Sequence, residues 1–226
     1  FDTNLGADRT IMEEAHEFLR RLDGEGPLPI LTSCSSGWVN FLEKFYPEII
    51  PNASTCRSPM TMLSSLIKTY YAEKTGRDPR DIYVVAVMPC VAKKIEIRRP
   101  EHYFAAGIPL TDTVLTTREL IWMIQCYGID FNGLPDGDFD NPLGISTGAA
   151  DIFGTTGGVM EATLRTAAAF LGGSPDQVEF TSVRAVEGLR EADVVFGDRT
   201  LHVGVANGLV NAKTLLDMAV NRERDF

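Results

Sequence analysis

The chain of 226 residues has 44% hydrophobic and 23% charged residues, a balance that excludes intrinsic disorder as the main state. Its formal net charge of −10 argues against a dedicated nucleic-acid binder, and no run of about 18 apolar residues predicts a membrane span. Four cysteines are too few for a disulfide scaffold, and no signal peptide is visible, so we expect a cytoplasmic protein.

Helical and strand-like segments alternate along the chain. Apolar periodicity and end signals predict helices over 10–22, 37–46, 59–73 and 117–126, a helix that follows Gly157-Gly158 and ends near Leu171, and a last helix after Gly208. Apolar runs predict strands over 28–32, 82–88, 112–116 and 178–183, and a hairpin of 193–196 with 200–206. The strand at 82–88 is expected to be buried on both faces, and 128–150 reads as a long irregular loop. This alternation predicts an α/β fold with parallel sheets covered by helices.

Three loops stand where such folds bind ligands. Cys34 precedes a helix, whose N-terminus favours a thiolate, and Cys90 follows the strongest predicted strand, with Lys93 three residues further on. The loop 153–158 resembles a backbone cradle for an anion. For Cys34 the alternative is a small residue packed in a tight turn, and for residues 88–96 it is an ordinary solvated surface turn. The loop 153–158 lacks the motifs of known nucleotide-binding loops and is weak evidence by itself.

An acidic cluster lies in the first predicted helix. Glu14 and Glu17 are three residues apart, both near the apolar stripe, and Arg21 is four residues beyond Glu17. One interpretation is a solvated charged face. The other is a relay of carboxyl groups that leads into the protein.

These motifs resemble the catalytic domain of the iron-only (FeFe) hydrogenases. Residues 88–96, Met-Pro-Cys-Val-Ala-Lys-Lys-Ile-Glu, match that family's second cysteine motif in full. Residues 32–38, Thr-Ser-Cys-Ser-Ser-Gly-Trp, resemble its first motif, and residues 115–120 and 152–162 are also similar to family sequence. The resemblance runs along almost the whole chain and implies an iron hydrogenase-like α/β fold, with two lobes of mostly parallel sheet flanked by helices.

The resemblance implies a cofactor and a set of site residues. The family's active site joins a 4Fe–4S cluster to a two-iron unit that carries CO and cyanide. Cys90 would then be a cluster ligand and Lys93 would hold a cyanide. The pocket of the two-iron unit would be lined by Ser58, Pro59, Met88, Phe153 and Gly154. The proton path would comprise Cys34, Glu14, Ser54, Glu17 and Arg21.

The sequence departs from the family pattern at the first cysteine motif. Cys34 is followed by Ser35, where most members have a second cysteine that serves as a cluster ligand. Serine is a poor substitute for a thiolate on iron. Two assignments therefore stay open: Cys34 is the terminal proton donor, or Cys34 ligates the cluster and Ser35 joins the relay.

We therefore expect residues 1–226 to be a fragment of the catalytic domain, cut at both ends. By the resemblance, the ferredoxin-like domains and the third cysteine motif would lie outside it, and the fragment alone would be free of cluster and inactive. The complete protein would interconvert H₂ with protons and electrons. Its partners would be ferredoxin or another electron carrier, iron–sulfur domains or subunits, and maturation proteins. The alternatives are a non-catalytic sensor or iron–sulfur assembly domain, and anion or nucleotide binding at residues 154–158.

Overall fold

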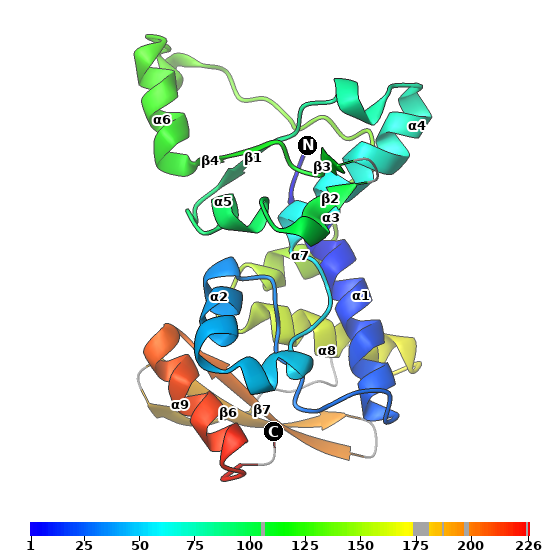
Figure 1. Ribbon diagram of the computed structural model, residues 1–226, viewed down its shortest axis with the longest axis vertical. Helices are drawn as coiled ribbons and strands as arrows, with labels where there is room; N and C mark the ends of the chain where they lie inside the picture. The colour runs from blue at the N-terminus through cyan, green and yellow to red at the C-terminus, as the bar shows by residue number, and fades with distance from the viewer. Residues whose placement is uncertain (105–106, 174–180, 187, 197–198, 225) are drawn as a thin grey trace. The chain divides into compact units, whose positions relative to one another are not determined.

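The structure is a computed structural model that describes residues 1–104, 107–173, 181–186, 188–196, 199–224 and 226. The chain divides into two compact units. Unit 1 comprises Phe1–Gly6 and Arg57–Ser146, and unit 2 comprises Ala7–Cys56 and Thr147–Phe226. The mixture of helices and small sheets confirms the α/β fold class (Figure 1).

Unit 2 is built on a three-stranded sheet with helices on both faces. The strands follow the order β5-β6-β7, and both pairs are antiparallel. The strands are β5 (Thr181–Val186), β6 (Leu189–Phe196) and β7 (Arg199–Ala206). The helices are α1 (Asn4–Leu22, which enters from unit 1), α2 (Ser36–Phe45), the 3₁₀ helix η1 (Pro47–Asn52), α7 (Gly148–Phe153), α8 (Gly158–Phe170) and α9 (Leu209–Val220).

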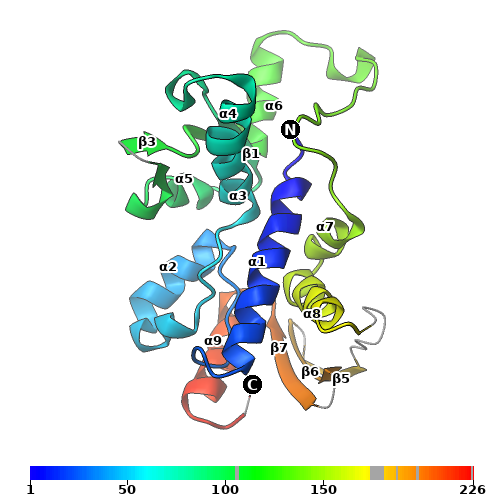
Figure 2. The same ribbon diagram turned by 90° about the vertical axis from the view of Figure 1, so that its right-hand side faces the viewer.

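The main core of unit 2 lies where α1 and α8 meet one face of this sheet. Ala15 and Phe18 of α1 pack with Leu164 of α8 and with Val194 and Phe196 of β6. Figure 2 shows α1 beside α8, next to the sheet. Successive side chains of a strand point to opposite faces of the sheet, so the face turned away from α1 and α8 is left for α9.

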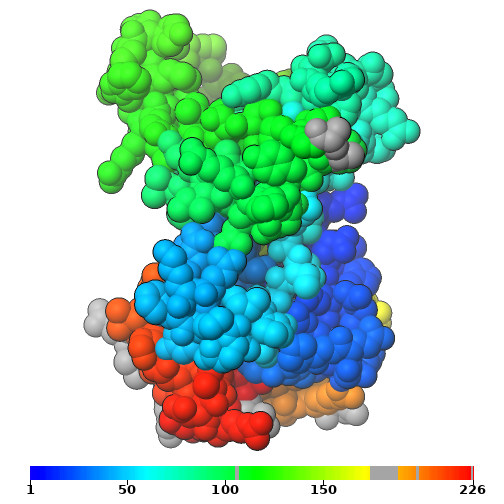
Figure 3. Space-filling view, in the orientation of Figure 1, coloured from blue at the N-terminus to red at the C-terminus, as the bar shows by residue number. Residues whose placement is uncertain are grey.

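A second core of unit 2 joins α2 to α9. Leu42 of α2 packs with Leu216 of α9, and the Tyr46 hydroxyl donates a 2.6 Å hydrogen bond to Asp217. Figure 3 shows this contact at the surface, where the blue residues of α2 and η1 adjoin the red residues of α9.

Unit 1 holds a parallel pair of strands and a long, interrupted helix. The strands β1 (Val85–Met88) and β4 (Thr113–Thr116) pair in parallel, and β2 (Tyr103–Phe104) pairs antiparallel with β3 (Ile108–Pro109). The long helix runs as α3 (Pro59–Leu66), the π-helical turn η2 (Ile67–Tyr71) and α4 (Ala72–Thr75). The remaining elements are η3 (Pro79–Asp81), α5 (Lys93–Glu96), η4 (Pro100–His102), α6 (Thr117–Cys126) and η6 (Phe131–Gly133).

The sheets differ from the expectation that they are mostly parallel. Only β1 and β4 pair in parallel among the strands that the structure describes. The physical reason is the length of the connections. A long connection that contains α5 joins β1 to β4, whereas two residues separate Phe196 from Arg199, and so short a connection permits only an antiparallel pair.

One further strand prediction is wrong, and another is confirmed in place but not in length or burial. The segment 28–32 forms only one bridge, between Leu31 and Ala53, because Pro27 and Pro29 have no backbone N–H to donate. The strand at 82–88 is shorter than expected, and Val85 and Val87 stay exposed on one face while Ala86 packs against Met60 and Val114. Of the predicted strand 178–183, residues 178–180 lie outside the described residues.

The predicted helices are confirmed with small changes at their ends. The first begins at Asn4 rather than near Thr10, and α6 is capped by Thr116, which forms a capping box with Glu119. Helix α7 was not predicted, and it begins at the end of the segment 128–150 that was expected to be irregular. Gly157, with φ +80°, and Gly158 form the tight turn that leads from α7 into α8.

Candidate active site

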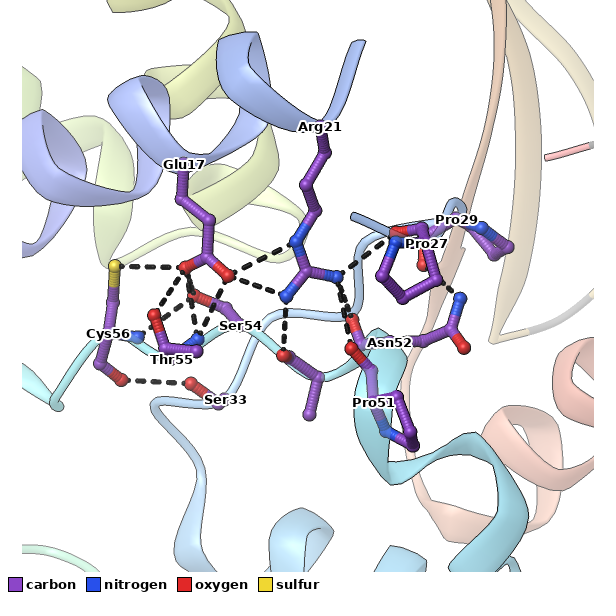
Figure 4. Close-up of polar contacts among 11 residues, drawn as sticks. Glu17, Arg21, Pro27, Pro29, Ser33, Pro51, Asn52, Ser54, Thr55 and Cys56 are labelled. Carbon is purple, nitrogen blue, oxygen red and sulfur yellow. Dashed lines mark hydrogen bonds and ion pairs between the residues drawn. The ribbon is translucent and has the colours of Figure 1, made fainter. Parts of the chain in front are cut away.

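Glu17 of α1 is the centre of a buried polar network in unit 2 (Figure 4). The Ser54 hydroxyl donates to Glu17 Oε2 at 3.1 Å, and Thr55 donates through its backbone N–H and its hydroxyl, both at 3.0 Å. Arg21 donates to Glu17 Oε1 through Nε at 3.1 Å and through Nη2 at 2.5 Å. The carboxyl group thus accepts bonds from its own helix and from a segment far along the chain.

Arg21 ties this network to the surrounding backbone. Besides its fork to Glu17, its guanidinium group donates to the carbonyl oxygens of Pro27, Asn52 and Ala53 at 3.1, 3.0 and 2.9 Å. A planar guanidinium presents five donors in fixed directions, which suits such a junction. Arg21 therefore holds the loop before α2 and the end of η1 against α1.

Glu14 and Glu17 lie in the same helix but have opposite pKa shifts. Burial, with a smaller effect from the charge of Glu17, raises the pKa of Glu14 to about 7. Burial also acts on Glu17, but hydrogen bonds from Arg21 and Thr55 outweigh it and lower its pKa. Near neutral pH, Glu17 is thus a fixed carboxylate, whereas Glu14 exchanges its proton readily.

The burial of these groups contradicts the interpretation of the cluster as a solvated face. Glu14, Glu17, Arg21 and Ser54 are all at most 6% exposed. Glu14 Oε2 has no hydrogen-bond partner among the described residues, while the hydroxyl groups of Ser54 and Thr163 lie close enough to lower its pKa. These four residues, which were predicted to belong to a proton path, therefore lie close together.

Cys56 lies at the edge of the network. Its thiol contacts Glu17 Oε2 at 3.6 Å, and its backbone N–H donates to the Ser54 hydroxyl. Burial and the nearby charges of Glu14 and Glu17 raise the pKa of this thiol to about 12, so it stays protonated. The Ser33 hydroxyl donates to the Cys56 carbonyl at 2.9 Å, which attaches the loop of Cys34 to the network.

Cys34 and Ser35 precede α2 in unit 2. Cys34 is half-buried, and Ser35 is the N-cap of α2, although its side chain makes no capping hydrogen bond. In the same unit, Phe153 is the last residue of α7, and Gly154 follows it as an exposed residue.

In unit 1, Glu96 is the centre of a second buried network. Its carboxylate Oε2 accepts a 2.7 Å hydrogen bond from the Lys93 ammonium, and Oε1 accepts one of 2.5 Å from the Ser58 hydroxyl. The Thr61 hydroxyl also donates to Oε1, at 2.8 Å, and contacts His102 Nδ1 at 3.2 Å. Two predicted pocket residues, Ser58 and Lys93, are thus joined through a carboxylate.

The other predicted residues of unit 1 lie beside this network. Met88 ends β1 and packs on Met60 and Val114. Cys90 is exposed in the turn between β1 and α5, and Pro59 is the first residue of α3.

Several members of these networks were not predicted as site residues, namely Thr55, Thr61, Glu96, His102 and Thr163. Glu96 could have been found, because it stands three residues after Lys93, a spacing at which helical side chains meet. The other four carry no local signal, since their partners lie in distant segments.

Comparisons with known proteins identify the family. The whole chain, residues 1–226, matches the family model described as "Iron only hydrogenase large subunit, C-terminal domain". The chain belongs to this family. It is 51% identical to the NADP-reducing hydrogenase subunit HndD of Solidesulfovibrio fructosivorans over 96% of its own length and 38% of that protein.

A solved hydrogenase structure and an iron–sulfur assembly factor are also similar to the chain. An apo FeFe-hydrogenase from Chlamydomonas reinhardtii superposes with a TM-score of 0.86 at 39% identity, over all of this chain and 64% of that one. The chain is 29% identical to the cytosolic Fe-S cluster assembly factor narfl of Xenopus tropicalis, over 96% of its own length and 48% of that protein. The chain thus spans about half or less of the two curated relatives, and its fold is iron hydrogenase-like.

The iron–sulfur and H-cluster chemistry of this family can be compared with the donors that the chain offers. A 4Fe–4S cluster usually takes four thiolates. The described residues contain no group of three or more potential ligands, and Cys56 is held as a thiol. Cys90 is exposed and lies beside the network that contains the Lys93 ammonium group. Its thiol suits one of the four ligand positions of such a cluster. The side chains therefore fit one part of such a cluster. Among the described helices, none is long and apolar enough to cross a membrane.

Proposed function

We propose that the protein carrying this chain is a hydrogenase that interconverts H₂ with protons and electrons. One observation carries the proposal: two buried carboxyl groups, Glu14 and Glu17, stand one helical turn apart with opposite pKa shifts and share the Ser54 hydroxyl as a neighbour. A proton path needs titratable groups within hydrogen-bond reach of one another. The similarity to hydrogenases supports the same activity.

In this proposal, each residue of the acidic network has a definite role. Glu14 takes up and releases a proton, because its pKa of about 7 leaves both forms populated at neutral pH. Ser54 passes the proton between the carboxyl groups, since a hydroxyl both donates and accepts. Glu17 is ionised at rest, takes the proton from Ser54 only in passing, and with Arg21 fixes the orientation of Ser54. Cys34 is the donor that would deliver the proton to the cofactor.

The residues of unit 1 would hold the cofactor. Cys90 would supply a thiolate to the 4Fe–4S cluster, and Lys93 would donate a charged hydrogen bond to an anionic ligand of the two-iron unit. By the family resemblance, its pocket would be lined by Ser58, Pro59, Met88, Phe153 and Gly154. When bound, the group supplies the redox chemistry of hydrogen, and ferredoxin or another low-potential carrier would exchange electrons with it.

The experiment is to express the whole protein that carries this chain, with its maturation proteins, and to measure H₂ evolution from a reduced low-potential donor. We expect iron binding and activity, with loss of both in Cys90→Ser. Cys126→Ser is the matched control, because Cys126 is exposed on α6 and distant in sequence from both motifs. A matured whole protein without iron or activity would contradict the catalytic proposal.

A second candidate function is iron–sulfur cluster assembly without hydrogen chemistry. The similarity to narfl and the serine at position 35 favour it. Ser35→Cys in the whole protein distinguishes the two functions. If Ser35 replaces a lost ligand, the added thiol increases the iron content. If the iron content does not change, position 35 does not supply a missing ligand, which leaves Cys34 as the candidate ligand of this loop.

A further inference from the structure

The network around Glu96 extends beyond the residues proposed to hold the cofactor. From Lys93 it passes through the Glu96 carboxylate to Thr61 and then to His102. Glu96 and Thr61 are buried, at 6% and 1% exposure, and the ring of His102 is half-buried. His102 therefore stands at the outer end of a hydrogen-bonded chain that leads to Lys93.

The hydrogen bonds of this chain have a definite direction. A threonine hydroxyl has one proton, and Thr61 donates it to Glu96 Oε1. The Thr61 oxygen must then accept from His102, so His102 Nδ1 carries a proton. The order of donation runs from His102 to Thr61 and from Thr61 to Glu96, and each bond polarises the next.

The backbone fixes His102 in this position. Its N–H donates to the Arg99 carbonyl at 3.0 Å, and its carbonyl accepts from the Leu110 N–H at 3.1 Å. Burial of the ring, together with the nearby guanidinium groups of Arg57 and Arg99, lowers the pKa of His102 against the opposing effects of Glu96 and Glu101. The imidazole is thus neutral near pH 7, in the form with the proton on Nδ1.

We propose that His102 is a positioning residue, which holds Glu96 through Thr61 so that Glu96 can hold the Lys93 ammonium group in place. Glu96 Oε1 accepts from two hydroxyls, those of Ser58 and Thr61. If the Thr61 bond is lost, the carboxylate is held less firmly and can rotate about the last bond of its side chain. Lys93 would then lose a fixed partner. The proposal rests on the role proposed for Lys93, but the contacts can be tested without bound cofactor.

The first test is the tautomer of His102 at neutral pH, measured by ¹⁵N NMR of the imidazole nitrogens in the protein that carries this chain. We expect the proton on Nδ1. In Thr61→Val, which removes the hydroxyl at similar size, we expect a shift toward the Nε2 form. Thr69→Val is the matched control, because among the described residues the Thr69 hydroxyl donates to the Ser65 carbonyl one turn earlier and not to the Glu96 network. A wild-type histidine with its proton on Nε2 would overturn the proposal.

The second test is the rate at which an amine-reactive reagent labels Lys93, followed by mass spectrometry. We expect Thr61→Val and His102→Phe to raise this rate roughly two- to tenfold, and His102→Asn, whose amide can still donate, to raise it less. Thermal unfolding is recorded for each variant, and Thr61→Val carries the test alone if His102→Phe fails to fold. A labelling rate equal to that of the wild type would overturn the proposal. A lack of hydrogenase activity would not affect this readout, so the two failures can be distinguished.

Discussion

Units 1 and 2 each bury a carboxylate that collects hydrogen bonds, but the two carboxylates have different donors. Glu17 in unit 2 accepts from two hydroxyls and also from a guanidinium fork and a backbone N–H, whose directions are fixed. Glu96 in unit 1 accepts only from groups that can turn about a single bond, an ammonium group and two hydroxyls, among the donors described above, and its network ends at a histidine. The comparison indicates a rigid junction in unit 2 and an adjustable one in unit 1.

The rigid junction predicts the largest effect. Arg21→Met removes the guanidinium group and keeps much of the side-chain volume, so Glu17 is left as a buried carboxylate without its cation. We expect the free energy of unfolding to fall by about 3–5 kcal/mol, as measured by urea denaturation.

Arg165→Met is the matched control for Arg21→Met. Arg165 also pairs with a glutamate four residues away, but both side chains are partly exposed, so we expect a loss of only about 0–1 kcal/mol. Equal losses in the two variants would contradict the picture of Arg21 as a buried junction.

The pair of Glu14 and Glu17 predicts two opposite effects of pH on stability. Glu14 has a raised pKa in the folded state, so the folded protein binds this proton more tightly, and stability falls as pH rises from about 4.5 to about 7. Glu17 has a lowered pKa, so its contribution is present above its unfolded pKa and is lost as pH falls through the folded value.

Glu14→Gln separates these two effects. The variant lacks the titration of Glu14, so its stability should decline less than that of the wild type between pH 4.5 and 8, by about 3 kcal/mol. Urea denaturation at several pH values measures this difference. Parallel curves for variant and wild type would show that Glu14 does not titrate in this range.

The sequence predicts the parts of both networks that lie within one helical turn. The spacing of Glu17 and Arg21, and that of Lys93 and Glu96, brings these pairs together in any helix. It does not reveal whether the pair is buried. The helix that carries Glu17 has the pattern of an ordinary surface helix, and its polar face is covered only when the segment around Ser54 packs against it.

The same limit explains the errors in the fold. The apolar run 82–88 predicts a strand in the right place, but burial of both faces depends on which elements cover it, and Val85 and Val87 stay exposed. The three-stranded sheet of unit 2 is antiparallel because short connections join its strands, a feature that helix and strand alternation alone does not convey.

The adjustable junction in unit 1 predicts a smaller loss than the one in unit 2. Lys93→Met removes the ammonium group, but the hydroxyls of Ser58 and Thr61 still donate to Glu96, so we expect a loss of about 1–3 kcal/mol in unfolding free energy. Lys94→Met is the control, because Lys94 pairs with the half-exposed Glu119 and should cost less. A loss as large as that of Arg21→Met would show that the hydroxyls do not compensate.

The smallest expected effect concerns Thr163 of α8, which faces Glu14. Its hydroxyl is buried without a hydrogen-bond partner among the described residues, yet it lies close enough to lower the pKa of Glu14. Thr163→Val should therefore leave stability within about 0.5 kcal/mol and raise the pKa of Glu14, because the ionised carboxylate loses the favourable dipole of a nearby hydroxyl.

Infrared titration of the protonated carboxyl band, with Glu14→Gln to assign it, measures this change. Thr163→Ser keeps the hydroxyl and should titrate like the wild type. If Thr163→Val also titrates like the wild type, Thr163 of α8 does not lower the pKa of Glu14, which burial and the charge of Glu17 raise. Glu14 would then depend on Ser54 and Arg21 alone for the interactions that favour its charged form.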